Sequence, residues 1–387
     1  TADDDPREHI KEDPGGNGAV SKAFYQRFRV AFNWKVNDNV QTMLRGDFAE
    51  FMWGDGYRPD AGVDTVMIDQ AWTEIKSGVM TLKVGQQDGA WGHGSMWSDQ
   101  FQGIQADFDL NPVVLKLLYV KESEGGNNGN VATDINENDD DDIYGIALAY
   151  ACDTFSGQLS WASLRSGSDS AAAAAARDQV TNGVSLYINV PLTDMLNFSA
   201  EGVYFSGDNG LTGAAARDYV GTQLFAVLNA KLTDTISGHV ALVWADAADA
   251  NETQVTCIQN DVTFHPIDFE GALTMDRGLV YGNLGMTNRT AFFEQATDRG
   301  AIGLVGGLKV AATDAVTLYG KLAYAEPNEN DDVTQLDNVI AAIGSVDYAW
   351  MPAVTLSAGV AYVAPDYSDN RDDDPAVEWV CRLGVSF

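Results

Sequence analysis

In this chain of 387 residues, several stretches carry charged side chains at every second position. Charges spaced in this way could act together on a solute. Between Phe24 and Val36 the cations alternate with apolar side chains, and residues i and i+2 of a strand share a face. Fixed charges that face water attract ions and solutes of opposite sign. The alternation assigns to such faces a basic set, Arg27, Arg29, Lys35, Arg45, Lys83, Lys116, Lys321 and Arg382, and an acidic set, Asp47, Asp69, Glu201 and Glu378.

Two interpretations of these charges remain open. If the charged face lines a water-filled passage, the charges at its narrowest part select the solutes that pass. Alternatively, opposite charges neutralise one another across adjacent strands and only stabilise the sheet. The residues concerned are Arg27, Arg29, Asp47 and Asp69.

An acidic run is the candidate metal site. The side chains of Asp139, Asp140, Asp141 and Asp142 offer the hard carboxylate oxygens that Ca²⁺ prefers, but the alternating ligands and fixed glycine of an EF-hand are absent. The other interpretation is a solvated loop tip whose field attracts cations and binds divalent ions loosely. No other cofactor is predicted.

Catalysis is not predicted. The four histidines, His9, His93, His239 and His265, are scattered along the chain. No Gly-x-Ser-x-Gly sequence and no cysteine or histidine pair with zinc-site spacing occurs. We therefore expect no catalytic residue and no enzymatic activity.

Alternating strands are the elements that must position the charges. The stretch from Val377 to Phe387 places Val377, Trp379, Cys381, Leu383, Val385 and Phe387 on one face. Its length is close to the 9–11 residues that a tilted strand needs to cross a bilayer. Similar runs are joined by eight short connections, at 37–39, 76–78, 110–112, 153–157, 192–194, 232–234, 312–314 and 350–352.

Longer polar segments separate these hairpins, at 52–65, 87–101, 123–142, 167–179, 207–218, 248–299, 326–338 and 364–376. Short turns at one rim and long loops at the other are typical of a transmembrane antiparallel β-barrel, with the short turns periplasmic and the long loops extracellular. We predict an all-β chain with an acidic amino-terminal loop segment, 1–21, and a single barrel, 22–387.

The predicted strand number is 16, with 18 as the alternative. Eight hairpins define sixteen strands and the terminal stretch adds a seventeenth, so that the first and the last would run toward the same rim. Two such neighbours cannot close an antiparallel barrel. Either an opening strand is hidden in residues 1–21 or precedes them, or one hairpin is false.

Composition agrees with this class. The formal net charge of −33 excludes a nucleic-acid partner, because phosphate binding requires a basic surface. Mean hydropathy is −0.16, and no apolar run approaches the roughly 18 residues of a membrane helix. A barrel strand shows only alternate residues to lipid, so its hydropathy signal is weak.

Two segments are candidates for narrowing a barrel interior. Segment 248–299 carries Asp268, Glu270, Asp276, Glu294 and Asp298 among many aromatic residues, and either enters the interior or forms an external cap. Segment 87–101, with Trp91, His93 and Asp99, is the second candidate.

The chain resembles Gram-negative trimeric porins, in particular those of sulfate-reducing and related anaerobic bacteria. The resemblance rests on residues 24–29, on the strand pair 66–72 and 80–86 with the glycine-rich segment 89–94 after it, and on the terminal Phe387, which matches the barrel-insertion signal of outer-membrane proteins. It implies passive diffusion of small hydrophilic solutes through a homotrimer in the outer membrane, in contact with lipid and lipopolysaccharide, with one loop folded into each barrel.

We therefore expect an outer-membrane porin whose acidic vestibules favour cations. Two alternatives remain. The inward basic residues would suit a substrate-selective channel for anionic solutes or sugars, and a chain without a lipid-facing belt would be a surface β protein that forms no channel.

Overall fold

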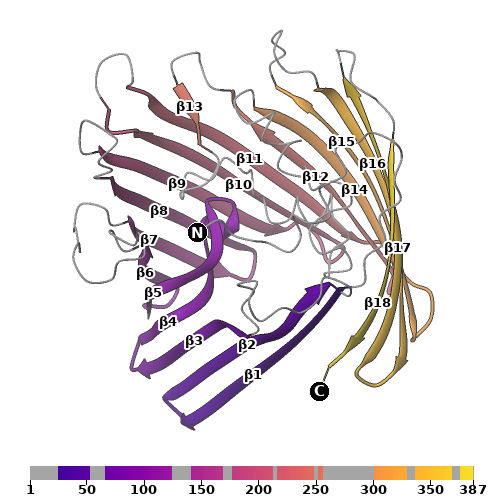
Figure 1. Cartoon of the computed structure of the whole chain (residues 1–387), viewed down its shortest axis with the longest axis horizontal. Coiled ribbons are helices and arrows are strands. Elements are labelled where there is room, and N and C mark those ends of the chain that lie inside the picture. The colour runs from indigo at the N-terminus through magenta and orange to yellow at the C-terminus, as the bar shows by residue number, and fades with distance from the viewer. Residues whose placement is uncertain are drawn as a thin grey trace.

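The computed structural model describes residues 25–52, 66–123, 141–168, 177–211, 216–247, 252–255, 300–328, 336–367 and 375–386. These residues form one curved sheet of eighteen strands (Figure 1). The strands of the first half are β1 (Tyr25–Asn37), β2 (Val40–Met52), β3 (Val66–Ser77), β4 (Met80–Trp91), β5 (Trp97–Asp109), β6 (Val113–Ser123), β7 (Asp141–Cys152), β8 (Phe155–Ser168) and β9 (Arg177–Pro191).

The second half continues with β10 (Leu196–Asp208), β11 (Asp218–Lys231), β12 (Ile236–Ala245), β13 (Glu252–Gln254), β14 (Ala301–Ala311), β15 (Val316–Pro327), β16 (Leu336–Met351), β17 (Val354–Tyr367) and β18 (Ala376–Val385). A single 3₁₀ turn among the described residues, η2 (Gly92–Gly94), joins β4 to β5. No helix in the described ranges is long and apolar enough to cross a membrane.

Each long strand pairs antiparallel with its neighbour in the chain, apart from the junction around β13. That three-residue strand pairs parallel with β11, while β12 pairs directly with β14. Antiparallel neighbours can be joined by very short turns. All eight predicted short connections lie at such turns in the structure, which confirms the predicted hairpins.

A repeated Thr-Asp sequence explains three of these turns. In each, the threonine hydroxyl accepts hydrogen bonds from the backbone N–H groups two and three residues later, at distances of 3.0–3.2 Å. The threonines are Thr193, Thr233 and Thr313. Such local bonds satisfy backbone donors that the ladder leaves free at the turn.

The two faces of the sheet differ as the alternation predicted. On the outer face large apolar side chains are exposed, including Leu322 and Trp379, which are both 66% exposed. On the inner face side chains such as Val243 and Val305 have no exposed surface. An apolar outer belt on alternating residues is what a lipid-facing barrel requires.

The strand count is seventeen long strands plus β13 in the described ranges. The predicted 16 is therefore one short of the long strands, while the alternative of 18 equals the sheet only when β13 is included. Strands β1 and β18 both run toward the rim of short turns, as expected from the sequence. Among the described pairings, β1 pairs with β2 and β18 with β17, which makes them the two ends of the sheet.

Segment 87–101 was predicted as a long loop, but β4 continues to Trp91 and β5 begins at Trp97, so most of it is strand. Its backbone groups pair across the hairpin up to Trp91 and Trp97, which is why the strands do not end at the rim. Residues 1–24, and residues 248–299 apart from 252–255 at their start, lie outside the described ranges together with the acidic candidates of the long loop.

Candidate functional site

The hairpin of β4 and β5 turns onto the inner face of the sheet. Trp91, Met96 and Trp97 are 0–2% exposed, and they share one apolar cluster with inner-face residues of β6, β7, β8 and β10. The turn η2 contacts β8, β9 and β10, which are far from β4 and β5 in the order of the sheet. The hairpin tip therefore reaches across the interior to a distant part of the wall (Figure 1).

Two glycines of the wall make room for this tip. A Cβ at Gly145 of β7 would lie 2.8 Å from the ring of Trp91, and one at Gly183 of β9 would lie 3.1 Å from the sulfur of Met96. Contacts this close displace one of the partners, since protein interiors are tightly packed. The tip of the hairpin therefore packs closely against the inner face of β7 and β9, where the two glycines leave space for its side chains.

Polar contacts fix the same tip. The indole Nε1 of Trp91 donates to the backbone carbonyl of Trp161 at 3.0 Å, and the hydroxyl of Ser95 donates to the carboxylate of Glu201, which is 3% exposed. The ring of His93 stacks on Tyr187 of β9 with 3.6 Å between centroids. Hydrogen bonds to a buried carboxylate are among the stronger neutral-to-charged contacts in proteins.

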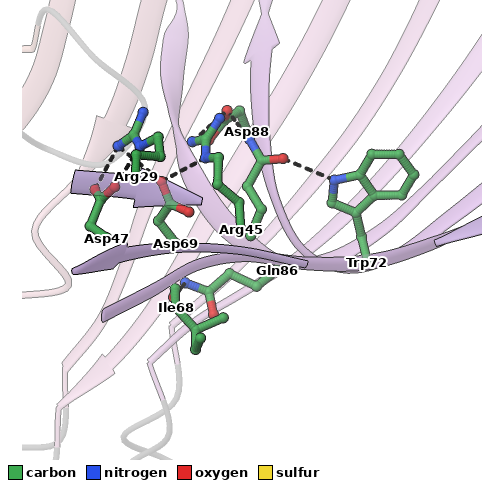
Figure 2. A network of polar contacts seen from close by, with 9 residues as sticks. Arg29, Arg45, Asp47, Ile68, Asp69, Trp72, Gln86 and Asp88 are labelled. Carbon is green, nitrogen blue, oxygen red and sulfur yellow. Dashed lines mark hydrogen bonds and ion pairs between the residues drawn. The ribbon is translucent and has the colours of Figure 1, made fainter. Parts of the chain in front are cut away.

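A network of ion pairs lies at the base of the hairpin (Figure 2). Arg29 of β1 binds Asp47 of β2 through two bonds of 2.5 and 2.6 Å, and its Nη2 lies 3.0 Å from Asp69 of β3. Arg45 of β2 binds Asp69 at 2.7 Å and Asp88 of β4 at 3.2 Å. The network therefore ties three strands of the wall to the hairpin.

A β-bulge places Asp69 in this network. Arg45 pairs with Gln70 while its neighbour Gly46 pairs with Ile68, so Asp69 is the extra residue of β3. Bulges redirect side chains in this way. Asp69 is 2% exposed, and both arginines reach its carboxylate.

The network continues through the neutral side chains of Gln70 and Trp72 to the ammonium of Lys83. The amide of Gln70 donates to Asp88 and accepts a hydrogen bond from the indole of Trp72 at 3.1 Å. The ammonium of Lys83 lies 4.4 Å from the centre of the Trp72 ring, a cation–π arrangement. The wall from β1 to β4 is thus a continuous set of charged and polar contacts.

Lys83 and Glu201 lie beside Trp72 and Ser95, as described above, and the other predicted charged residues fall into three groups. Arg29, Arg45, Asp47 and Asp69 are brought together with Asp88. Of the four residues in the neutralising interpretation, Arg29 contacts both Asp47 and Asp69, and the side chain of Arg27 lies outside the described set. Lys35, Lys116, Lys321 and Arg382 lie at separate inner-face positions, with Lys35 bound to Asp38 at 2.9 Å. Arg27, Glu378 and Asp99 are strand residues whose side chains lie outside the described set.

The structure adds two residues to the site that the sequence did not indicate, Asp88 and Ser95. Asp88 and Ser95 were missed because they fall in a segment interpreted as an irregular loop, where no face can be assigned. Lys309 of β14, which lies away from this site, is a further inward cation that the sequence could have indicated, since it alternates with the apolar residues Leu308 and Val310.

The calcium prediction concerns residues at the border of the described ranges. Asp139 and Asp140 lie outside them, while Asp142 of β7 accepts a hydrogen bond from Tyr119 at 3.0 Å and lies 3.4 Å from the ammonium of Lys121. Within the described residues, no group of three acidic, histidine or cysteine side chains is arranged to hold a metal ion.

Comparison with known proteins rests on the fold alone. No protein-family model and no curated protein matches the sequence. A BenF-like porin from Pseudomonas fluorescens Pf-5 matches over 97% of this chain and 94% of its own, at 11% identity and a TM-score of 0.56. OccAB3 of Acinetobacter baumannii matches over 94% and 92%, at 11% identity and a TM-score of 0.57.

A third structure, OccK2 (OpdF) of Pseudomonas aeruginosa in complex with glucuronate, matches over 95% of this chain and 93% of its own, at 10% identity and a TM-score of 0.55. Together with the alternating faces and the short turns at one rim, these likenesses confirm the predicted fold class. The chain has the antiparallel transmembrane β-barrel fold of the BenF-like porin.

Proposed function

We propose that the protein is a channel of the bacterial outer membrane for passive diffusion of small hydrophilic solutes and ions. The observation that carries this function is the hairpin tip, which packs across the inner face of a sheet whose outer face is apolar. A segment folded into the barrel narrows the passage and limits the size of the solutes that can pass, while the outer surface of the barrel remains in lipid.

The structure of the inward hairpin favours a channel over a surface β protein without a pore. A surface protein has no use for an exposed belt of leucine, valine and aromatic side chains along the outer face of the sheet. We assign the constriction to residues 87–101, with Trp91 and His93 at its tip. The alternative segment, 248–299, lies mostly outside the described ranges.

Planar-bilayer recording of the purified protein tests the channel. We expect discrete conductance steps, and steps in groups of three if the protein is the homotrimer that the resemblance to porins implies. Heat-modifiable migration on a gel would accompany a closed barrel. Release of the protein from membranes without detergent, together with an absence of steps, would contradict the proposal.

Cation preference is the second part of the proposal. It is supported by the net charge of −33, by the acidic runs in predicted loops, and by the ion-pair network, in which Asp47, Asp69 and Asp88 outnumber Arg29 and Arg45. Reversal potentials in a salt gradient would show cation selectivity. A clear anion preference would favour the substrate-selective alternative for anionic solutes.

The finer assignments follow from the same proposal. Lipid and lipopolysaccharide would contact the outer belt, divalent cations would bind loosely at acidic loops, and no catalytic step is required of any residue. Particular likeness to porins of sulfate-reducing bacteria rests on residues 24–29, 66–72, 80–86 and 89–94. Chemical cross-linking of the native protein would show whether it is a trimer.

A further inference from the structure

A recess of about 830 Å³ lies on the inner side of the sheet near the rim of short turns. Its wall is formed by β10, β11, β12, β14, β15 and β16, and the turns that follow β7 and β9 border it. The volume is within the range of small-molecule sites in proteins. The recess is separate from the ion-pair network at β1–β4, with which it shares no residue.

Strand register sets two rows of inner-face residues in this wall. One row aligns His239 of β12, Gly307 of β14 and Lys321 of β15. The adjacent row aligns Ser237, Lys309, Tyr319 and Ser345 across β12, β14, β15 and β16. Neighbouring positions on one face of paired strands are close enough for side chains to act on the same ligand.

Gly307 leaves space for the imidazole of His239, which lines the recess. A Cβ at this position would lie 2.3 Å from the imidazole Cε1 of His239 and 2.7 Å from its Nε2. The imidazole therefore lies over the glycine, between β12 and Lys321 of β15. A larger residue at position 307 would push the ring off the wall.

The charge of Lys309 distinguishes this wall from other basic positions. Its ammonium lies 5.7 Å from the centre of the Tyr319 ring, and within the described residues it has no ion-pair partner. By contrast, Lys231 at the same recess binds Asp234 at 2.8 Å, and Arg45 binds two carboxylates. A cation without a carboxylate partner in a water-filled interior remains available to a solute anion.

The remaining wall groups indicate what else such a solute carries. The hydroxyls of Ser237 and Ser345 and the amide of Asn229 border the recess as hydrogen-bonding groups, and Tyr319 offers a ring face. The hydroxyl groups of a solute can form hydrogen bonds with the two serines and the asparagine, and its C–H groups can pack against the ring of Tyr319. Asp153, Asp194 and Asp347 also line the recess and disfavour a solute of high negative charge.

We propose that this recess is a solute-binding subsite for a small, singly charged anion that carries hydroxyl groups, with Lys309 as its main cationic contact. The inference rests on the proposed channel and adds a specific site near the short-turn end of the passage. Solute would rest there before it leaves the barrel, so binding would be weak and saturable.

Gluconate is a suitable probe, with sorbitol as its uncharged counterpart of similar size. In planar bilayers we expect gluconate, added on the short-turn side, to block the ion current saturably and at lower concentration than sorbitol. Lys309→Gln should raise the half-blocking concentration of gluconate about tenfold, since a charge-assisted contact contributes more than 1 kcal/mol. Lys309→Arg, which keeps the charge, should restore block.

Lys231→Gln is the matched control, because that lysine borders the same recess but binds Asp234. It should leave gluconate block unchanged. Tyr319→Leu provides a second test of the site, and the heat-modifiable migration of each variant confirms its folding. Equal block by gluconate and sorbitol, or equal effects of the Lys309 and Lys231 variants, would overturn the subsite.

Failure of the subsite and failure of the channel are separable. Titration calorimetry with gluconate and the detergent-solubilised protein measures binding without any current. Binding that depends on Lys309 supports the subsite even without conductance steps. Conductance steps without Lys309-dependent binding leave the channel standing and remove the subsite.

Discussion

Arg45 is the residue that joins the wall to the inward hairpin. It contacts Asp69 of β3 at 2.7 Å and Asp88 of β4 at 3.2 Å, and Asp69 is almost completely buried. Removal of one partner from a buried ion pair leaves an uncompensated charge, which costs more than the pair contributes. The arginine therefore serves the structure of the site as well as its electrostatics.

Arg45→Met should lower the free energy of unfolding by about 3 kcal/mol, because the carboxylate of Asp69 loses one of its two cations while it remains buried. The same change should increase cation selectivity, since one positive charge leaves the wall. Urea unfolding in detergent and reversal potentials measure the two effects.

Lys35→Met is the control for Arg45→Met. Lys35 and Asp38 are both largely exposed, at 67% and 95%, and exposed pairs contribute little. If both variants destabilise the barrel equally, the buried network has no special role in stability.

Ser95 makes the polar contact that holds the hairpin tip to Glu201. Ser95→Ala should destabilise the tip by about 1–3 kcal/mol, because the buried carboxylate loses a donor. We expect more frequent fluctuations of the single-channel current, with little change in the unfolding of the whole barrel. Currents as steady as those of the unmodified protein would show that packing alone holds the tip.

At the scale of elements, the β4–β5 hairpin differs from every other described hairpin because its tip packs inward. The packing of this tip depends on Gly145 and Gly183, which leave space for Trp91 and Met96. A glycine-to-alanine substitution at one of these positions adds a single methyl group and tests the packing directly.

Gly145→Ala should displace the Trp91 ring, because the added Cβ would lie 2.8 Å from it. Overpacking of this kind costs about 1–3 kcal/mol. We expect a larger single-channel conductance and a change in tryptophan fluorescence.

Gly320→Ala is the matched control, since nothing lies within 4 Å of a Cβ at that strand position. It should leave conductance and fluorescence unchanged. An unaltered conductance in Gly145→Ala would mean that the hairpin tip does not limit the passage.

The whole molecule has an apolar exterior and a strongly acidic composition. Leu322, in the middle of β15, and Leu232, in the turn between β11 and β12, are 66% and 50% exposed. Both are leucines on the surface, but only the first is at mid-strand. Their comparison separates a lipid-facing belt from ordinary surface exposure.

Leu322→Arg should destabilise the folded barrel in lipid by about 2–4 kcal/mol, whereas Leu232→Arg at the rim should cost about 0–1 kcal/mol. Unfolding of both variants in lipid vesicles measures the difference. Equal costs would contradict the proposed membrane position of the strands.

Cation selectivity should weaken as salt increases, because the field of the acidic groups is screened over about 10 Å at 0.1 M and about 3 Å at 1 M ionic strength. Reversal potentials at fixed concentration ratio and rising mean salt measure this change. Selectivity that persists at 1 M salt would instead place the deciding charges at the narrowest part of the passage.

Local pattern was sufficient for much of the fold. The period of two identified the outer face of β18, including exposed Cys381, and the repeated Thr-Asp turns located hairpin ends. These features depend on neighbours within a few residues, and backbone geometry converts them into structure. The odd number of long strands was also visible in the sequence, since eight hairpins give sixteen strands and the terminal stretch adds one more.

Tertiary structure decided the site. The direction of segment 87–101 depends on Gly145, Gly183 and Glu201, which follow it by about fifty to a hundred residues, and no local signal reports such packing. The bulge at Asp69 likewise decides which carboxylate the arginines share. Alternation along the chain was sufficient to predict the strands, their faces and the membrane-spanning class, because each of these depends on a period of two. Contacts between distant strands determined what crosses the interior and which charges remain available there.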